Sequence, residues 1–430
     1  MKVLHVNYSD AGGAAIAMIR IDEALRKNGM DSECLFFRSK KKSVEPYCKA
    51  VWRNKLNAAE NILVSKCVGN GPEGLRSLNL FPSGLAGYLN RCDADVIHLH
   101  WVNAETMSIR ELGGIRKPVV WTLHDMWPFC GAEHYTTDQR YVTGYQKSEV
   151  KKKEMRNCRP SIDIDRWTFR RKERYWKTLD VYPVTVSRWL GDLARKSCLF
   201  RSHEIRVIHN TLDLEVFKPM DRQNARQAFN LPLDPKIILF GSAANVDRRK
   251  GFDLLENALN HLRKLYSGDV ELVVFGTPKS GNVAGYKTHW LGRIDSQKQL
   301  ALLYNSANVT CIPSRQETFG QTALESLAAG IPPVAFGATG LLEIIEHKDN
   351  GYLVEPYDTK ELAKGLAWVL ASEGGEGIDY GVLSSNARKK AEVAFGPGTV
   401  ANQYMECYRA ALGRQSALVG LTSGIHKVSV

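Results

Sequence analysis

At 430 residues and 44% hydrophobic content, the chain is too long for one average hydrophobic core and apolar enough to fold throughout, which predicts two domains. The opening residues MKVLHVNYSD reach the acidic residue Asp10 too early for a secretory signal, and no run of about 18 apolar residues follows. We therefore expect a cytoplasmic protein. Nine scattered cysteines show no CxxC pair and no metal-ligand spacing with histidine, which predicts reduced thiols and no metal.

The net charge of +12 is concentrated in residues 140–206, which hold 18 Lys and Arg against 8 Asp and Glu. Such a stretch either binds nucleic acid, acidic lipid headgroups or an anionic substrate, or is a solvated helix face. Four aromatic residues lie among these charges and would anchor an amphipathic helix at a membrane surface: Trp167, Phe169, Tyr175 and Trp176. No zinc finger, RNP motif or helix-turn-helix signature is evident, so we expect no nucleic-acid partner.

Short apolar runs alternate with helical patterns along the whole chain, which predicts parallel sheets covered by helices on both faces. The first series of expected strands is VLHVNY, DVIHLHW, VVWTLHD, VYPVTVS and IRVIHN, with a helix from about residue 14 after the first. The second series is IILFGSA, VELVVFG, THWLGR, NVTCIPS, PPVAFG and GYLVEP. The fold class is therefore α/β, with two Rossmann-like domains that face each other across a cleft.

The domain boundary is expected between about residues 210 and 235, where Pro219, Pro232 and Pro235 interrupt the chain. The first domain then covers residues 1–210 and the second 211–396. The last helix, near residues 398–413, has no strand after it, so residues 397–416 are expected to cross back to the first domain. Residues 417–430 read as a frayed tail.

A glycine pair follows the first expected strand in DAGGAAIAMIRIDEALRKNG. Gly12 and Gly13 form a tight turn there, and the helix that begins next would present backbone amides to a phosphate. A simple strand-to-helix turn remains the alternative. The spacing is not GxGxxG and the next strand ends in Arg38 and Lys40, which argues against a dinucleotide site.

The segment PSRQETFGQTALESLAAGIPPVAFGATGLLEII places two carboxylates around a predicted helix start. A helical pattern begins at about Gln321, so Glu317 lies in the preceding loop and Glu325 about one turn inside the helix. A carboxylate there can accept hydrogen bonds from ribose or sugar hydroxyls, while amides near Gly320, Gln321 and Thr322 receive a diphosphate. Acidic residues in a first helical turn also commonly only offset the helix dipole.

The chain resembles the retaining GT-B glycosyltransferases of family 4 over nearly its full length. The resemblance rests on the two-glutamate segment 313–346, the GGA loop at 12–14, VSRWL at 186–190, VIHNTLD at 207–213, RKGFDLL at 249–255 and NGYLVEP at 350–356. HLHW and WTLHDMWPFCG further resemble the exopolysaccharide branch of that family. Relatives of that branch often carry a cysteine cluster after the WPF segment, and only Cys130 and Cys158 stand here.

The resemblance implies roles for single residues. Glu325 matches the glutamate that holds the nucleotide ribose, Glu317 the one that contacts hydroxyls of the transferred sugar, and Lys250 the lysine that neutralises the diphosphate. His124 matches a histidine that bonds the donor sugar or its phosphate; by its local sequence alone, a site role and a cap are equally open. Gly292 matches a position where the base approaches the backbone.

The chain departs from the family pattern at one position and matches it at two more. Family members usually carry an arginine five residues before the lysine, where Asn245 stands, so that Arg248 or Arg249 would take its place. Asn210 and Asp213 match a hinge segment with a structural role.

The expected activity is therefore transfer of a hexose from a nucleotide-diphosphate sugar, with retention and without a metal or other cofactor, to a lipid-linked saccharide in surface polysaccharide synthesis. The protein would stay in the cytoplasm, with peripheral contact to an anionic membrane. The alternative is a non-catalytic protein that binds acidic lipids or polyanions through residues 140–206. A phosphorylase or epimerase of the same fold fits this chain poorly, since phosphorylases of this shape are longer.

Overall fold

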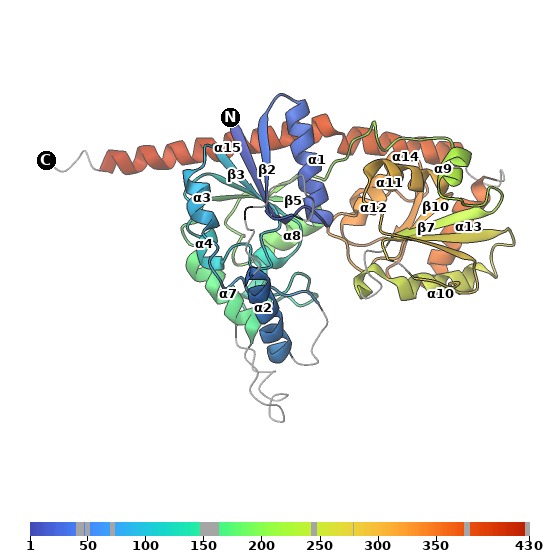
Figure 1. Ribbon diagram of the computed structural model, residues 1–430, viewed down its shortest axis with the longest axis horizontal. Helices are drawn as coiled ribbons and strands as arrows, with labels where there is room; N and C mark the ends of the chain where they lie inside the picture. The colour runs from blue at the N-terminus through green and yellow to red at the C-terminus, as the bar shows by residue number, and fades with distance from the viewer. Residues whose placement is uncertain are drawn as a thin grey trace. The chain divides into compact units, whose positions relative to one another are not determined.

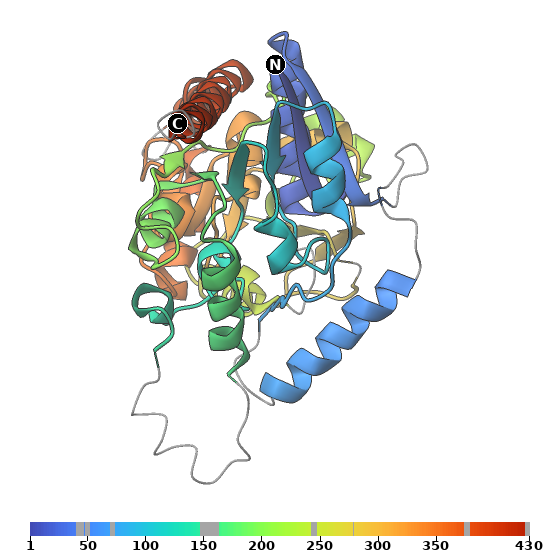
Figure 2. The same ribbon diagram turned by 90° about the vertical axis from the view of Figure 1, so that its left-hand side faces the viewer.

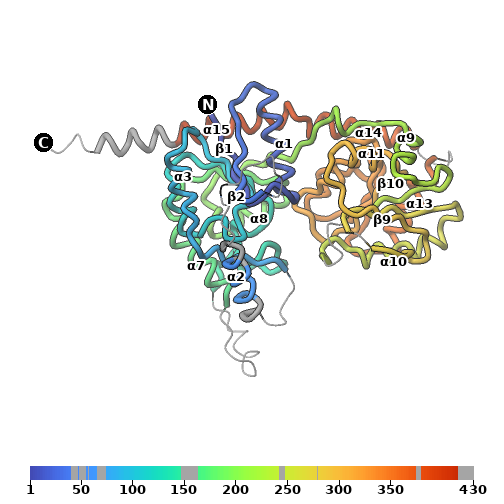
Figure 3. The backbone as a smooth tube through the Cα atoms, in the orientation of Figure 1, coloured from blue at the N-terminus to red at the C-terminus, as the bar shows by residue number. Residues whose placement is uncertain are grey.

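The computed structural model describes residues 1–39, 47, 52–68, 74–146, 163–241, 247–277, 279–373 and 379–425 (Figure 1). Figure 3 follows the backbone from the N-terminus to the C-terminus. The chain divides into two compact units. Unit 1 contains Met1–His209 and Val400–Val430, and unit 2 contains Asn210–Thr399. Each unit is built on one parallel sheet of six strands, which confirms the predicted α/β fold with two Rossmann-like units (Figure 1).

The sheet of unit 1 has the strand order β2-β1-β3-β4-β5-β6, and all its neighbouring strands run parallel. The strand bounds are β1 Lys2–Ser9, β2 Asp31–Arg38, β3 Val96–Leu99, β4 Val119–Leu123, β5 Val181–Thr185 and β6 Arg206–Val207. The chain leaves β1 toward the edge, then crosses back to β3 on the other side. That reversal places the carboxyl ends of β1 and β3 at a topological switch point, where ligands of such sheets bind.

Helices cover both faces of this sheet, because parallel strands buried on both sides need apolar partners on each. Their bounds are α1 Gly13–Lys27, α2 Trp52–Val68, α3 Leu85–Arg91, α4 Ile109–Leu112, η1 Trp127–Phe129, α5 Arg140–Thr143, α7 Ile164–Tyr175 and α8 Arg188–Lys196. Figure 2 shows α2 and α7 together beside one end of the sheet, and these two helices are in contact.

The last helix, α15 (Pro397–Ile425), completes the core of unit 1. Tyr404, Cys407 and Tyr408 are fully buried in one cluster with residues of β1, β3, β4 and β5. The expectation of a helix ending near residue 413 and a frayed tail from 417 was wrong, since α15 continues to Ile425. No proline follows Pro397 to end the helix earlier, and residues 426–430 lie outside the described residues.

The sheet of unit 2 has the order β12-β11-β10-β7-β8-β9, again with all neighbours parallel. The strands are β7 Lys236–Gly241, β8 Val270–Phe275, β9 Thr288–Gly292, β10 Val309–Ile312, β11 Pro333–Phe336 and β12 Tyr352–Val354. The helices are α9 Arg222–Ala228, η3 Arg248–Lys250, α10 Phe252–Leu262, α11 Gln297–Ser306, α12 Gln321–Ala328, η4 Thr339–Glu343, α13 Thr359–Ser372 and α14 Tyr380–Phe395.

Helix starts in unit 2 fall into two kinds. Side-chain oxygens of Asp221, Ser296 and Asp358 accept backbone N–H groups and cap α9, α11 and α13. Gly251 and Gly320 precede α10 and α12 and supply no side-chain cap. Because β7 and β10 lie side by side and lead to α10 and α12, two uncapped helix starts lie near the carboxyl ends of the central strands, where backbone amides remain for a ligand.

Among the residues that the structure describes, no helix is both long and apolar enough to cross a bilayer.

Candidate functional site

A lysine and a glutamate from two loops of unit 2 meet at the carboxyl ends of its strands. Lys250 ends η3, which follows β7, and Glu317 lies between β10 and α12. Nζ of Lys250 donates to Oε1 of Glu317 at 2.6 Å, and Oγ of Ser314 donates to the same oxygen at 2.9 Å. Within the described part of the chain both partners use Oε1, which leaves Oε2 for ligand hydroxyls.

Backbone contacts hold these two loops together. The N–H of Arg315 donates to the carbonyl of Arg249 at 2.7 Å, and the Arg315 guanidinium bonds both oxygens of Asp253. Gly251 has a φ of 70°, and a Cβ there would lie 1.9 Å from the carbonyl oxygen of Pro313. Only glycine permits so close an approach, which brings the lysine loop to the glutamate loop.

The Glu317 carboxyl is ionised despite its burial, with 9% of the residue exposed. Burial alone would raise its pKa, but the charges of Lys250 and Arg249 outweigh burial and hold the pKa below the usual value. A carboxylate and an ammonium group therefore face each other at neutral pH. Such a pair can bind a ligand that carries both hydroxyls and phosphate oxygens.

The second glutamate of the segment lies inside α12. Glu325 is buried, and its Oε2 accepts a hydrogen bond from the hydroxyl of Tyr304 on α11 at 2.8 Å. Gly320, which precedes the helix, has a φ of 113°, and a Cβ there would lie 2.6 Å from Cδ2 of Leu341. The predicted helix start at Gln321 is confirmed, with Thr322 as the next residue of its first turn.

Two more residues predicted for the donor site, Arg249 and Gly292, lie in unit 2. The Arg249 side chain bonds Asp247 at 2.9 Å, and Arg248 shares η3 with it. Gly292 ends β9, and its carbonyl accepts the N–H of Gly276 at 2.6 Å. Asn245 lies outside the described residues.

In unit 1 the predicted glycine turn joins β1 to α1. Gly12 precedes the helix and Gly13 is its first residue, with no side-chain cap. The first turn of α1 contains no acidic residue, whereas Arg26 and Lys27 stand in its last turn. No acidic side chain of this first turn would therefore repel a phosphate.

His124 follows β4 and is the third member of a chain of histidines. Nδ1 of His5 lies 3.0 Å from Nε2 of His100, and Nδ1 of His100 lies 2.9 Å from Nε2 of His124. Burial lowers the pKa of His124 to about 4, against a small opposite effect of Asp125. His124 is thus a neutral imidazole that is hydrogen-bonded to the ring of His100. It does not cap the following helix, since the residue at the cap of η1 is Met126.

The residue after it, Asp125, fixes the loop that begins at His124. Its Oδ2 lies 2.6 Å from Nδ1 of His134 and accepts Nε1–H of Trp101 at 2.9 Å, while Oδ1 accepts the N–H of Trp127. Burial would raise the pKa of Asp125, but His134 and these N–H groups hold it below the usual value. The carboxylate therefore serves to hold the backbone next to His124.

A metal-capable group also lies in unit 1. His5, His98 and His100 each offer a ring nitrogen, and these atoms lie within 4.8 Å of one another. Both ring nitrogens of His98 already have partners, the hydroxyls of Tyr408 at 2.8 Å and Thr122 at 2.7 Å. A metal would have to replace these hydrogen bonds inside the core.

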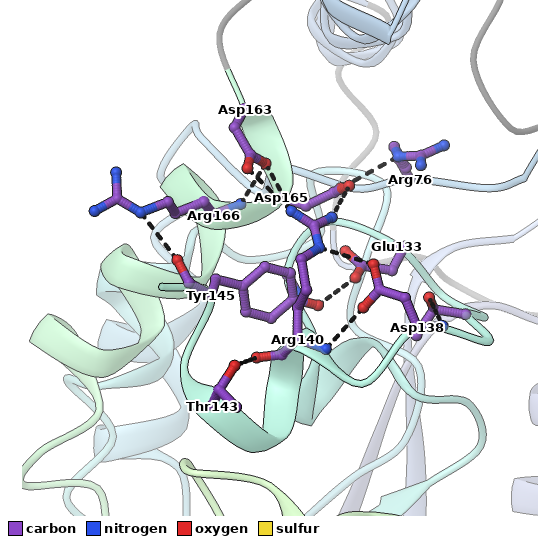
Figure 4. Close-up of polar contacts among 11 residues, drawn as sticks. Arg76, Glu133, Asp138, Arg140, Thr143, Tyr145, Asp163, Asp165 and Arg166 are labelled. Atoms are coloured by element: carbon purple, nitrogen blue, oxygen red, sulfur yellow. Dashed lines mark hydrogen bonds and ion pairs between the residues drawn. The ribbon is translucent and has the colours of Figure 1, made fainter. Parts of the chain in front are cut away.

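Two cations of the basic stretch 140–206 are engaged within unit 1. Figure 4 shows Arg140 between Asp138, Asp163 and Asp165, with Arg76 on the far side of Asp165. The ammonium of Lys172 is buried and donates to the carbonyls of Trp127, Cys130 and Gly131. These two cations are engaged inside the protein, which weakens the polyanion-binding alternative. Residues 147–162 lie outside the described residues, and they include Lys151, Lys152, Lys153 and Cys158.

The expected aromatic membrane anchor on α7 was wrong in part. Phe169 is fully buried, and Trp176 donates its Nε1–H to the carbonyl of Ile109 while its ring meets those of Trp121 and Trp127 edge-on. Trp167 is 43% exposed. The periodicity that places aromatics on one helix face also suits packing against a core, and here packing uses two of the four, Phe169 and Trp176.

Residues at the start of unit 2 hold its first segment to its last helix. The side chain of Thr211 donates to the carbonyl of Phe395 at 2.7 Å, and Oδ1 of Asp213 accepts the N–H of Glu215 at 2.9 Å. Asn210 is buried.

Several side chains at these sites were not predicted from the sequence. Ser314 and Tyr304 contact the two glutamates, and His5 and His100 lead to His124. A signal for the histidines was present, because HLHW and TLHD each place a histidine at the end of an expected strand and VLHVNY places one inside a strand. Tyr304 carried no local signal, since only tertiary packing brings it to Glu325.

Two family models match the chain, one in each half. Residues 11–216 match the model of glycosyltransferase family 4, and residues 221–390 match that of glycosyl transferases group 1. Among curated proteins, D-inositol 3-phosphate glycosyltransferase of Mycobacterium marinum is 24% identical over 94% of this chain and 82% of that protein. An uncharacterised glycosyltransferase of Methanocaldococcus jannaschii is 30% identical over 53% of this chain and 60% of that protein.

Solved structures show the same fold over the whole length. Sucrose-phosphate synthase of Thermosynechococcus elongatus matches with a TM-score of 0.64 at 19% identity, covering 96% of this chain and all of that one. Anabaena HepE in complex with UDP and glucose matches with a TM-score of 0.59 at 17% identity, covering 95% of this chain and all of that one. At these identities the likeness concerns the fold.

Proposed function

We propose that this chain, which matches the models of glycosyltransferase family 4 in its first half and of glycosyl transferases group 1 in its second, transfers a hexose from a nucleotide-diphosphate sugar with retention of configuration. The observation that carries the proposal is the Lys250–Glu317 pair beside the uncapped start of α12. This group offers a cation and helix amides for a diphosphate and a carboxylate for sugar hydroxyls. It needs no metal.

Each residue of the donor site then has a defined task. Glu325, held by Tyr304, binds the ribose hydroxyls, and Oε2 of Glu317 binds hydroxyls of the transferred sugar. Lys250 with Arg248 or Arg249, the amides of Gly320, Gln321 and Thr322, and the glycine turn of Gly12 and Gly13 neutralise the diphosphate. The base approaches the backbone at Gly292, and His124 bonds the donor sugar or its phosphate.

The reaction breaks the bond between the anomeric carbon and the phosphate oxygen. The nucleoside diphosphate leaves with the electron pair, and an oxocarbenium-like sugar forms. An acceptor hydroxyl attacks from the side of the leaving group, and the diphosphate takes its proton as the new C–O bond forms. The protein contributes mainly stabilisation of the charge that develops on the diphosphate, for which Lys250 is placed.

For the acceptor we propose a lipid-linked saccharide of surface polysaccharide synthesis, with peripheral contact to an anionic membrane. The relative from Mycobacterium marinum, named as a D-inositol 3-phosphate glycosyltransferase, supports a phosphorylated cyclitol as the second candidate. Parallel assays with both acceptors decide between them. The anomeric configuration of the product, determined by NMR, tests retention, and an inverted product would overturn it.

Thermal-shift measurements with UDP, GDP, ADP, CMP and their sugar conjugates test the donor site. A ligand at a hundred times its dissociation constant adds about 2.7 kcal/mol of stability, which raises Tm by several degrees. We expect one nucleoside diphosphate to stabilise the native chain and not Glu325→Ala. Stabilisation by anionic liposomes or oligonucleotides alone would instead favour the non-catalytic alternative.

A further inference from the structure

Three histidine rings cross unit 1 in one hydrogen-bonded chain. His5 lies in β1, His100 directly follows β3 and His124 directly follows β4, and these strands are neighbours in the sheet. The contacts run from Nδ1 of His5 to Nε2 of His100, and from Nδ1 of His100 to Nε2 of His124. The chain starts in the core and ends at His124, whose Nδ1 takes no part in it.

All three rings are neutral at physiological pH. Burial, with the charge of Arg26, lowers the pKa of His5 to about 3, and burial lowers the pKa of His100 well below its usual value and that of His124 to about 4. A neutral imidazole carries one N–H and one acceptor nitrogen. Only two arrangements therefore make both hydrogen bonds: every ring donates toward His124, or every ring donates toward His5.

The buried end of the chain discriminates between these arrangements. Nε2 of His5 is buried and has no hydrogen-bond partner among the described residues. If every ring donated toward His5, this nitrogen would carry a buried, unpaired N–H, the kind of group that proteins rarely leave unsatisfied. If every ring donates toward His124, only a lone pair remains there. The second arrangement puts a proton on Nδ1 of His124.

We propose that His5 and His100 are positioning residues that fix the His124 imidazole with its proton on Nδ1, so that His124 offers a hydrogen-bond donor to an oxygen of the sugar donor and does not act as a base. The contact of His124 with the donor rests on the proposed function. The fixed proton rests only on the geometry of unit 1. A hydrogen-bond donor at this position stabilises negative charge on an oxygen of the sugar nucleotide. The proton of the attacking acceptor hydroxyl is then left to the diphosphate.

A neighbouring histidine provides the matched control. His98 is equally buried, and its ring centroid lies 4.6 Å from that of His5 and 4.2 Å from that of His100. Its two nitrogens bond Tyr408 and Thr122 instead, so that His98 lies beside the chain without belonging to it. Loss of His98 perturbs the same part of the core and leaves the hydrogen bonds among His5, His100 and His124 intact.

The test is a two-bond ¹⁵N–¹H correlation spectrum of the full chain labelled with ¹⁵N-histidine, in which the two tautomers have distinct nitrogen shifts. In the unmutated protein at pH 7 without any ligand, we expect His124 as the Nδ1–H tautomer. His5→Phe should give a mixture of the two His124 tautomers, because the ring that orients His100 is lost. His5→Asn should restore the Nδ1–H tautomer of His124 through its amide N–H, and His98→Phe should leave that tautomer unchanged. An Nε2–H signal for His124 in the unmutated protein overturns the proposal, whether or not the variants fold.

Steady-state kinetics with UDP-glucose, and with whichever of the two candidate acceptors is active, separate this proposal from the proposed function. Loss of one oriented hydrogen bond in His5→Phe should lower kcat about tenfold with KM little changed, while His98→Phe keeps the native kcat. Equal losses in His5→Phe and His98→Phe would count against positioning. If the spectrum shows the Nδ1–H tautomer but the protein binds no nucleotide, the proposed function fails and the fixed tautomer stands.

Discussion

The ammonium of Lys250 and the carboxylate of Glu317 lie 2.6 Å apart, although 66 residues separate them in the chain. Each is therefore the other's counter-ion at the strand ends of unit 2. The pair keeps the lysine extended and the carboxylate ionised before any ligand arrives. A diphosphate can then take over the cation, while the glutamate keeps Ser314 as a partner.

Replacement of Lys250 by alanine should lower kcat about a hundredfold, since a cation that meets the leaving diphosphate contributes on the order of 3 kcal/mol of transition-state stabilisation. Steady-state rates with the native donor measure this loss. The matched control is Lys264→Ala, an exposed lysine after the far end of α10, which should leave the rate unchanged. Unchanged turnover in Lys250→Ala would remove the assignment.

The same pair should make stability depend on pH in the acid range. The pKa of Glu317 in the folded state is below its ordinary value of 4.5, so that its stabilising contribution is present above that value and lost as pH falls through the folded pKa. Urea unfolding of the native chain and of Glu317→Gln between pH 7 and 3 measures this. The variant should lose less stability on acidification, and parallel curves for the two proteins would contradict the ion pair.

The histidine chain should give a separate decline at higher pH. The pKa of His5 is about 3 and that of His124 about 4 in the folded state, against an ordinary value of 6.5. Because the unfolded chain binds protons first, stability should begin to fall as pH drops below 6.5 and continue to fall down to about pH 4. His5→Phe should reduce this slope, as measured by urea unfolding midpoints at pH 7.5, 6, 5 and 4.

Tyr304→Phe should weaken nucleotide binding several-fold without changing kcat, because one hydrogen bond to Glu325, for which we propose ribose binding, contributes about 1 kcal/mol. The ring contacts with Phe275 and Phe217 are retained in phenylalanine, so the fold should persist. Isothermal titration with the nucleoside diphosphate measures the effect. A change in kcat with unaltered affinity would place Tyr304 elsewhere in the reaction.

Gly320→Ala should destabilise unit 2 by about 2 kcal/mol or more, from a strained positive φ and a Cβ 2.6 Å from Leu341. Gly281 has a φ of 90° but open space around it, so Gly281→Ala measures the strain alone. The difference between the two unfolding free energies then reports the close approach. Equal values would show that Leu341 moves aside without cost.

The sequence predicted the sheets well because buried parallel strands are short apolar runs. Runs such as VELVVF and VVWTL have few other conformations available, and both are strands in the structure. The start of α12 was likewise readable from the helical period that begins at Gln321. These features depend on local sequence.

The contacts that complete the site depend on tertiary packing, which local patterns do not encode. Tyr304 reaches Glu325 only because α11 lies against α12, and Phe169 is buried against the ring of Tyr145. The length of α15 was also missed. A helix ending near residue 413 was expected, but α15 continues to Ile425.

The burial of α15 in unit 1 has a consequence for the order of synthesis. Tyr404, Cys407 and Tyr408 belong to the same apolar cluster as Val3 and Val96, yet about 300 residues of translation separate them from β3, and all of unit 2 is made in between. On the ribosome the contiguous unit 2 can close its core first, whereas this cluster of the nascent unit 1 must wait without the residues that α15 contributes. A nascent chain stalled after residue 399 should therefore expose apolar surface to chaperones that the released protein conceals.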